Sequence, residues 1–81
     1  MVTPRQIRAG RALLGWTQQL LADRALVAVN SVRAVERGLS YPKEETVESM
    51  RAALTKAGIV FLSEDVMGEG VRLAKPAARR K

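Results

Sequence analysis

The residues with the clearest potential for chemistry lie between positions 29 and 38, in the stretch VNSVRAVERG. Val32 and Val35 are three residues apart, so a helix places them on one face. The amide of Asn30 and the guanidinium of Arg33 then point away from that face. These groups can hydrogen-bond to the edges of DNA bases, and an arginine can also bind a phosphate. A helix with so thin an apolar stripe and so polar an outer face predicts a DNA-binding surface.

The composition argues against an enzyme. The 81 residues include no histidine and no cysteine. The commonest general base, the usual catalytic triads, nearly all zinc sites and any disulfide are therefore excluded. We find neither a nucleophile–base pair nor a phosphate-binding loop in the sequence. We expect a non-enzymatic protein that uses no cofactor and no metal.

The positive charge is unevenly distributed. The net charge is +6, and residues 1–38 carry six arginines against two acidic groups. Residues 59–74 are net acidic, and the last seven residues carry four basic groups. This pattern favours a polyanion as the partner of the basic segments and a different partner for the acidic segment. The alternative is a basic surface that only keeps the protein soluble. The polar N-terminus is unlike a signal peptide, and no apolar run suits a membrane span, so we expect a soluble cytoplasmic protein.

The first expected helix has a complete set of end signals. Thr3 can cap it, Pro4 suits its first position and Gln6 completes a T-x-x-Q capping box. Gly15 suits the left-handed conformation at which many helices end.

Three further helices follow in the expected arrangement. The second begins after Thr17, the third spans Val29–Arg37 before Gly38, and the fourth spans about 44–57. The second and third helices are short and are joined by three or four residues. This spacing predicts a helix-turn-helix.

The apolar pattern changes after Gly58. The segments IVFL (59–62) and VRLA (71–74) predict two strands around an acidic loop, residues 63–70. An isolated hairpin is marginal in water, so we expect it to pair with the hairpin of a second copy. Residues 1–58 would then form the DNA-binding domain, 59–75 the dimerisation element and 76–81 a disordered basic tail. The expected dimerisation residues are Ile59, Phe61, Leu62, Val71 and Leu73.

The run GWTQQLLADRALVAVNSVRAVERG resembles the helix-turn-helix of the Xre family, which includes phage repressors and Cro proteins. Members of that family often contain the pattern LGWSQEELA…GVS…I…IERG. Leu14–Gln18 matches the opening, Leu21 and Ala22 match the buried pair, and Glu36–Gly38 matches the ending. The resemblance covers residues 4–57. It implies a mainly α, four-helix repressor-like domain, here followed by a short C-terminal β-hairpin that pairs across a dimer.

By this resemblance the third helix enters the major groove. Asn30 can pair with adenine, Arg33 can reach a guanine or a phosphate, and Val29 and Ala28 suit a thymine methyl group. Gln18, at the start of the second helix, suits a phosphate. The full set of expected DNA-binding residues is Gln18, Ala28, Val29, Asn30, Arg33, Arg37 and Lys43.

Each of these roles has a structural alternative. Asn30 can instead cap a helix that begins one turn late. Arg33 and Gln18 can be ordinary solvated helix residues. Trp16 is expected in the core, with a stacking platform for single-stranded bases as the alternative.

The resemblance also implies a structural ion pair between Arg11 of the first helix and Glu36 of the third. Three positions depart from the family pattern. Leu26 stands where glycine is usual in the turn, so a positive φ there would be strained. Ala28 replaces the usual polar cap, and Leu20 replaces an acidic residue.

We therefore expect a homodimeric, sequence-specific transcriptional regulator, most simply a repressor, on a palindromic double-stranded operator. The alternative is an antitoxin-like or antiactivator protein that acts through a protein partner. Its expected contact is the acidic loop, with Val66 and Met67 exposed.

Overall fold

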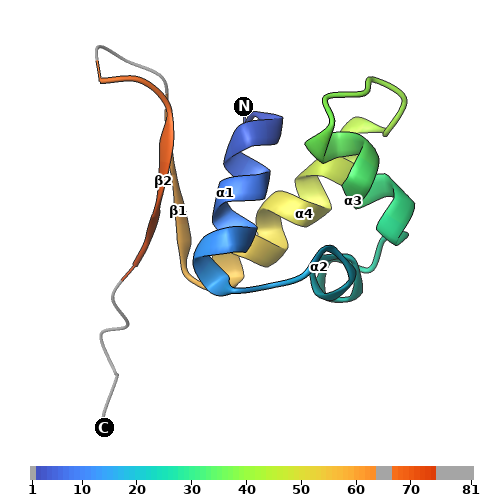
Figure 1. Ribbon diagram of the computed structural model, residues 1–81, viewed down its shortest axis with the longest axis horizontal. Coiled ribbons are helices and arrows are strands. Elements are labelled where there is room, and N and C mark those ends of the chain that lie inside the picture. Colours follow the sequence, from blue (N-terminus) through green and yellow to red (C-terminus); the bar gives the residue numbers. More distant parts are fainter. Residues whose placement is uncertain (1, 64–66, 75–81) are drawn as a thin grey trace, which may run out of the picture.

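The hairpin lies against one side of a group of four helices (Figure 1). A computed structural model describes residues 2–63 and 67–74 of the chain. The elements, in order, are α1 (Pro4–Leu14), α2 (Gln18–Ala25), α3 (Val29–Glu36), α4 (Glu44–Lys56), β1 (Ile59–Leu62) and β2 (Gly70–Leu73). The mainly α fold with a C-terminal hairpin is confirmed. The expected tail and residues 64–66 of the acidic loop lie outside the described residues.

The end signals of α1 act as the sequence predicts. The Gln6 backbone N–H donates to the Thr3 hydroxyl at 3.1 Å, and the Thr3 N–H donates to the Gln6 side-chain oxygen at 3.0 Å. Gly15 ends the helix with φ 70°. The third helix is one residue shorter than predicted, because Arg37 is its C-cap.

The core forms where the helices meet. Its fully buried large side chains come from all four helices and from β1, and they are Ile7, Leu21, Val32, Met50, Leu54 and Ile59. Gly10 of α1 allows the close approach of β1, since a Cβ atom there would lie 3.3 Å from the Ile59 side chain. The strand is thus part of the same core as the helices.

The hairpin is anchored to its own chain, which corrects part of our sequence-based interpretation. β1 and β2 pair antiparallel, with Ile59 opposite Leu73 and Phe61 opposite Val71. These four residues share one face of the hairpin, and Phe61 and Val71 pack against the core. Ile59 is only 1% exposed, so its side chain cannot contact a second copy. The hairpin packs against the helices of its own chain, so it needs no partner to cover this face.

A buried glutamine fixes the loop end of the hairpin. Gln6 of α1 donates its side-chain N–H groups to the carbonyl oxygens of Leu62, at 2.9 Å, and Gly70, at 2.8 Å. The oxygen of the same side-chain amide accepts from the Thr3 N–H and so completes the N-terminal cap of α1. The sequence suggested only the capping role, because the strand partners lie 56 and 64 residues away. The observed second strand begins at Gly70, one residue earlier than predicted.

Candidate nucleic-acid interface

The turn between α2 and α3 has an unusual residue. Leu26 is the C-cap of α2 with φ 60° and ψ 43°, the left-handed region that normally favours glycine. Its side chain is 90% exposed, so no burial offsets the strain. Ala28 is the N-cap of α3 and provides no side-chain hydrogen bond, which excludes Asn30 as the cap of a later-starting helix.

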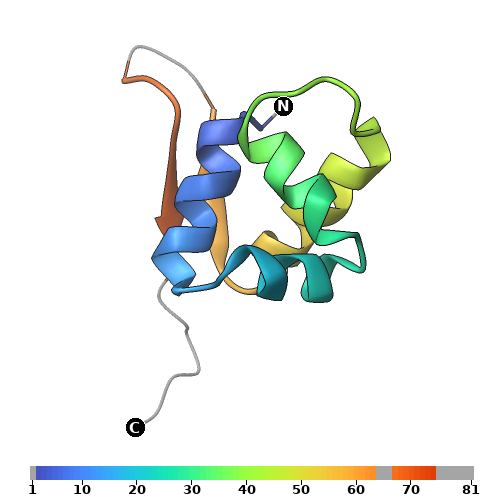
Figure 2. The ribbon, with the colours of Figure 1, turned by 45° about the vertical axis from the view of Figure 1, so that its right-hand side comes forward.

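The orientation of α3 agrees with its valine spacing. Val32 and Val35 are buried, while Asn30, Arg33 and Arg37 are exposed. Figure 2 shows α2 and α3 together on the side of the molecule opposite the hairpin. The polar side chains of α3 therefore project from a surface that the hairpin does not cover.

Two residues of α3 are less accessible than the helical period predicts. Val29 is half-buried and packs against the core, because its position borders the Val32 face. Ala34, four residues after Asn30, is placed on the outer face by the helical spacing but is only 2% exposed. The chain reverses beside it, where the Leu39 N–H donates to the Ala34 carbonyl at 3.0 Å. The accessible surface of α3 is therefore narrower and more polar than the sequence predicts.

The two expected base-reading residues contact each other. Arg33 donates from Nη1 to Oδ1 of Asn30 at 2.8 Å, and both side chains are exposed. Ala28, also exposed, precedes them, and Arg37 follows them at the C-cap of α3.

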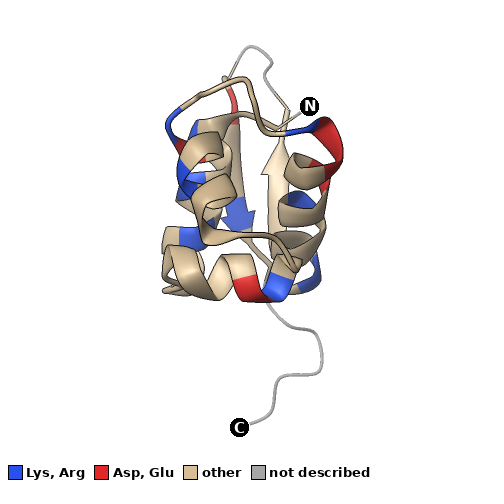
Figure 3. Cartoon of the chain, turned by 90° about the vertical axis from the view of Figure 1, so that its right-hand side faces the viewer, with Lys and Arg blue, Asp and Glu red and all other residues tan. Residues whose placement is uncertain are grey.

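The next basic residue along the chain is Lys43, which is exposed at the N-cap of α4. Glu44 and Glu45 follow it in the first turn of that helix. Figure 3, which views the α2–α3 side, shows Lys and Arg along one part of this side and a group of acidic residues at the start of α4. The basic surface therefore ends at the acidic residues of the first turn of α4.

A partly buried ion pair joins α3 to α1. Arg11 donates from Nε to Oε2 of Glu36 at 2.7 Å and from Nη2 to Oε1 at 2.9 Å. Their side chains are 19% and 3% exposed. Hydrogen bonding to Glu36 raises the pKa of Arg11 above its ordinary value. The bidentate geometry fixes the end of α3 against α1.

Two further donors at this ion pair were not evident from the sequence. Gln18 donates from Nε2 to the Glu36 carboxylate at 3.1 Å, and Arg8 donates to the Glu36 backbone carbonyl at 2.8 Å. Arg11 also donates to the Trp16 carbonyl at 2.9 Å. Gln18, expected at a phosphate, is thus held beside the ion pair at the start of α2.

Trp16 packs against the core, as predicted, and the Arg24 guanidinium lies 5.2 Å from its ring centroid. Over the part of the chain that the structure describes, no group of acidic side chains is arranged to hold a metal ion. No helix in this part is both long and apolar enough to cross a membrane.

The geometry defines a helix-turn-helix DNA-binding domain: a short helix, a tight turn and a second helix with a polar outer face. A comparison with known families supports this class, since the family described as "Helix-turn-helix" matches residues 7–56. The chain belongs to this Xre-like family of DNA-binding regulators. A search of curated proteins finds no match.

Proposed function

We propose that the protein is a sequence-specific transcriptional repressor that binds an inverted-repeat operator as a homodimer. One observation carries the proposal: α3 turns Val32 and Val35 inward and leaves Asn30, Arg33 and Arg37 accessible. Asn30 and Arg33 supply base recognition, while Arg37 and Lys43 supply phosphate contacts. Ala28 and the exposed edge of Val29 supply apolar contacts beside Asn30. Occupation of a promoter would block transcription.

The proposed dimer joins two copies through their hairpins. Val60, on the outer face of the hairpin, is 39% exposed. Leu73, which pairs with the neighbouring residue Ile59 on the other face, is 45% exposed. Phe61, Leu62 and Val71 remain partly accessible beside them. A twofold dimer must place its two recognition helices roughly 34 Å apart to meet successive major grooves. The hairpin does not cover α3, so contact between two hairpins leaves α3 accessible. The twofold arrangement that brings both α3 helices to one face of the duplex is part of the proposal.

The experiment selects binding sites from random double-stranded DNA with the full chain and measures affinity for the selected site across a salt series. We expect an inverted repeat and a preference over unrelated DNA of at least about a thousandfold. Affinity that falls steeply with salt but ignores sequence would contradict the proposal.

Val60→Asp tests the dimer without removing the core residue Ile59. We expect a monomer in sedimentation and a larger loss of binding to the full operator than to a half-site. Leu13→Asp, at a 47% exposed position of α1, is the matched control and should remain dimeric. If the Val60→Asp protein remains dimeric, this face of the hairpin is not the dimer interface.

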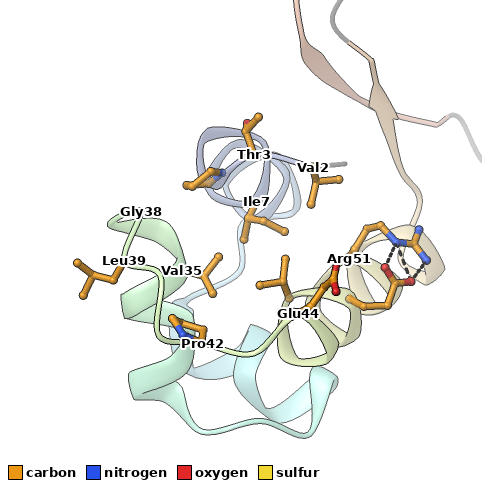
Figure 4. A pocket seen from close by; sticks show the side chains of 12 residues that line it. Val2, Thr3, Ile7, Val35, Gly38, Leu39, Pro42, Glu44 and Arg51 are labelled. Atoms are coloured by element: carbon orange, nitrogen blue, oxygen red, sulfur yellow. Dashed lines mark hydrogen bonds and ion pairs between the residues drawn. The ribbon is translucent and has the colours of Figure 1, made fainter.

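A second candidate function, antitoxin-like or antiactivator binding of another protein, has an apolar groove in its favour. The groove, of about 460 Å³, lies between the start of α1, the loop after α3, and α4 (Figure 4). Its lining includes Ile7, Val35 and Leu39, with Glu44 at its edge. Met67, in the acidic loop that the sequence suggests as a contact, is 88% exposed, whereas Val66 lies outside the described residues. Failure of site selection together with tight capture of one protein partner would favour this function.

A further inference from the structure

We propose that Arg33 orients the side-chain amide of Asn30, and that the two residues recognise DNA as one coupled unit. This inference rests on the proposed function and identifies how the recognition helix selects a base. It starts from one contact: Arg33 Nη1 donates to Asn30 Oδ1 at 2.8 Å, between two exposed side chains three residues apart on α3.

The contact has no evident role in forming the helix. The N-cap of α3 is Ala28, so the Asn30 side chain is not used for capping. An exposed pair three residues apart contributes little to the stability of a helix. Asn30 is the second residue of α3, near the end of a recognition helix that reaches base edges. The contact is therefore located where orientation of the amide affects recognition more than folding.

The chemistry of the two groups decides which end of the amide faces Arg33. An asparagine amide has an oxygen that accepts and a nitrogen that donates, and a half-turn exchanges them. A guanidinium has donors only, so it holds the oxygen and turns the Nδ2 group away. Without Arg33, both orientations of the amide are open to Asn30.

An amide fixed in this way selects adenine against guanine. Nδ2 can donate to N7 of a purine, and the second lone pair of Oδ1 can accept from the N6 amino group of adenine. Guanine presents its O6 acceptor at that position, so two acceptors would face each other. The remaining N–H groups of Arg33 stay available for a neighbouring phosphate or guanine.

The test compares base preferences selected by the full chain and its variants, with circular dichroism to check folding. Asn30→Ala identifies the operator position that Asn30 reads. At that position we expect Arg33→Met to lower the preference for adenine over guanine by about tenfold. Arg33→Lys should restore part of it, because an ammonium can donate to Oδ1. Added to Asn30→Ala, Arg33→Met should change this preference by less than about twofold, since the pair acts as a unit.

Arg37→Met is the matched control, because Arg37 is exposed on the same side of α3. It should weaken binding to all sequences alike and leave base preferences unchanged. A folded Arg33→Met protein that keeps the adenine preference would overturn the coupling while leaving the proposed function intact. A wild-type chain that selects no sequence overturns both.

Discussion

At the scale of single residues, the left-handed conformation of Leu26 is a local conflict between sequence and fold. A leucine with φ 60° has its Cβ close to neighbouring backbone, whereas a glycine adopts this conformation without strain. Because Leu26 is 90% exposed, removal of its side chain loses almost no buried apolar surface. The turn is thus a place where a smaller residue fits the backbone better.

We predict that Leu26→Gly stabilises the protein by about 0.5–1 kcal/mol. Glycine relieves the backbone strain of the folded state, but part of this gain is lost because glycine also increases the backbone entropy of the unfolded chain. Urea unfolding followed by circular dichroism measures the change. Leu26→Ala is the control, since it removes the exposed side chain but keeps the strained φ. Equal stabilisation by alanine and glycine would show that strain is not the cause.

At the scale of elements, the Arg11–Glu36 pair sets how α3 meets α1. We predict that Arg11→Met destabilises the domain by about 3 kcal/mol, because it leaves the Glu36 carboxylate buried without its main partner. A double-mutant cycle with Glu36→Gln should show strong coupling in urea unfolding. The exposed pair of Glu48 and Arg51 in α4 is the comparison, and its removal should have little effect. Additive effects at Arg11 and Glu36 would contradict this role.

A second contact between elements depends on pH. The hydrogen bond from Arg5, at 2.7 Å, and that from the Thr3 hydroxyl lower the pKa of Glu69 below its ordinary value. A carboxyl group with a lowered folded-state pKa stabilises the fold above its unfolded-state pKa. That stabilisation is lost as the pH falls through the folded-state pKa. We therefore expect this contact between α1 and the hairpin to weaken only in acid.

Carbon-detected NMR titration of the side-chain carboxyl groups tests this expectation. Arg5→Gln should raise the pKa of Glu69 toward that of a free glutamate. Arg51→Gln should leave Glu69 unchanged and raise the pKa of Glu48 instead, because Arg51 lowers the pKa of Glu48. A Glu69 titration that is insensitive to Arg5 would show that this contact does not hold the hairpin against α1.

These elements were predictable to different degrees. The caps at Thr3 and Thr17 and the stop at Gly15 depend on residues close in sequence, so the helices follow directly from the local pattern. The outward orientation of Asn30 and Arg33 follows from the valine spacing. The burial of Ala34 does not follow, because it depends on the path of the chain after α3.

At the scale of the whole molecule, a net charge of +6 favours association with a polyanion, but the acidic start of α4 restricts where that charge is useful. Lys43 lies directly before this acidic segment. Its proposed contact is with a phosphate, which carries no sequence information.

We predict that Lys43→Gln weakens binding to all DNA sequences and makes it less dependent on salt. The slope of log affinity against log salt should become shallower by about 1 for each copy in the complex. Fluorescence anisotropy across a salt series measures both quantities. Lys56→Gln, at the other end of α4, is the control. An unchanged slope for Lys43→Gln would place Lys43 outside the interface.

The sequence by itself determined the four helices, their ends to within a residue, and the polar outer face of α3, because caps, glycines and apolar spacing act over a few residues. It also indicated the family, through a pattern confined to one continuous segment. Only the tertiary structure decided where the hairpin packs, that Ile59 belongs to the core, and that Gln6 joins α1 to both strands. Those features depend on how whole elements pack together; the two strand carbonyls that bind Gln6, for example, lie 56 and 64 residues from it.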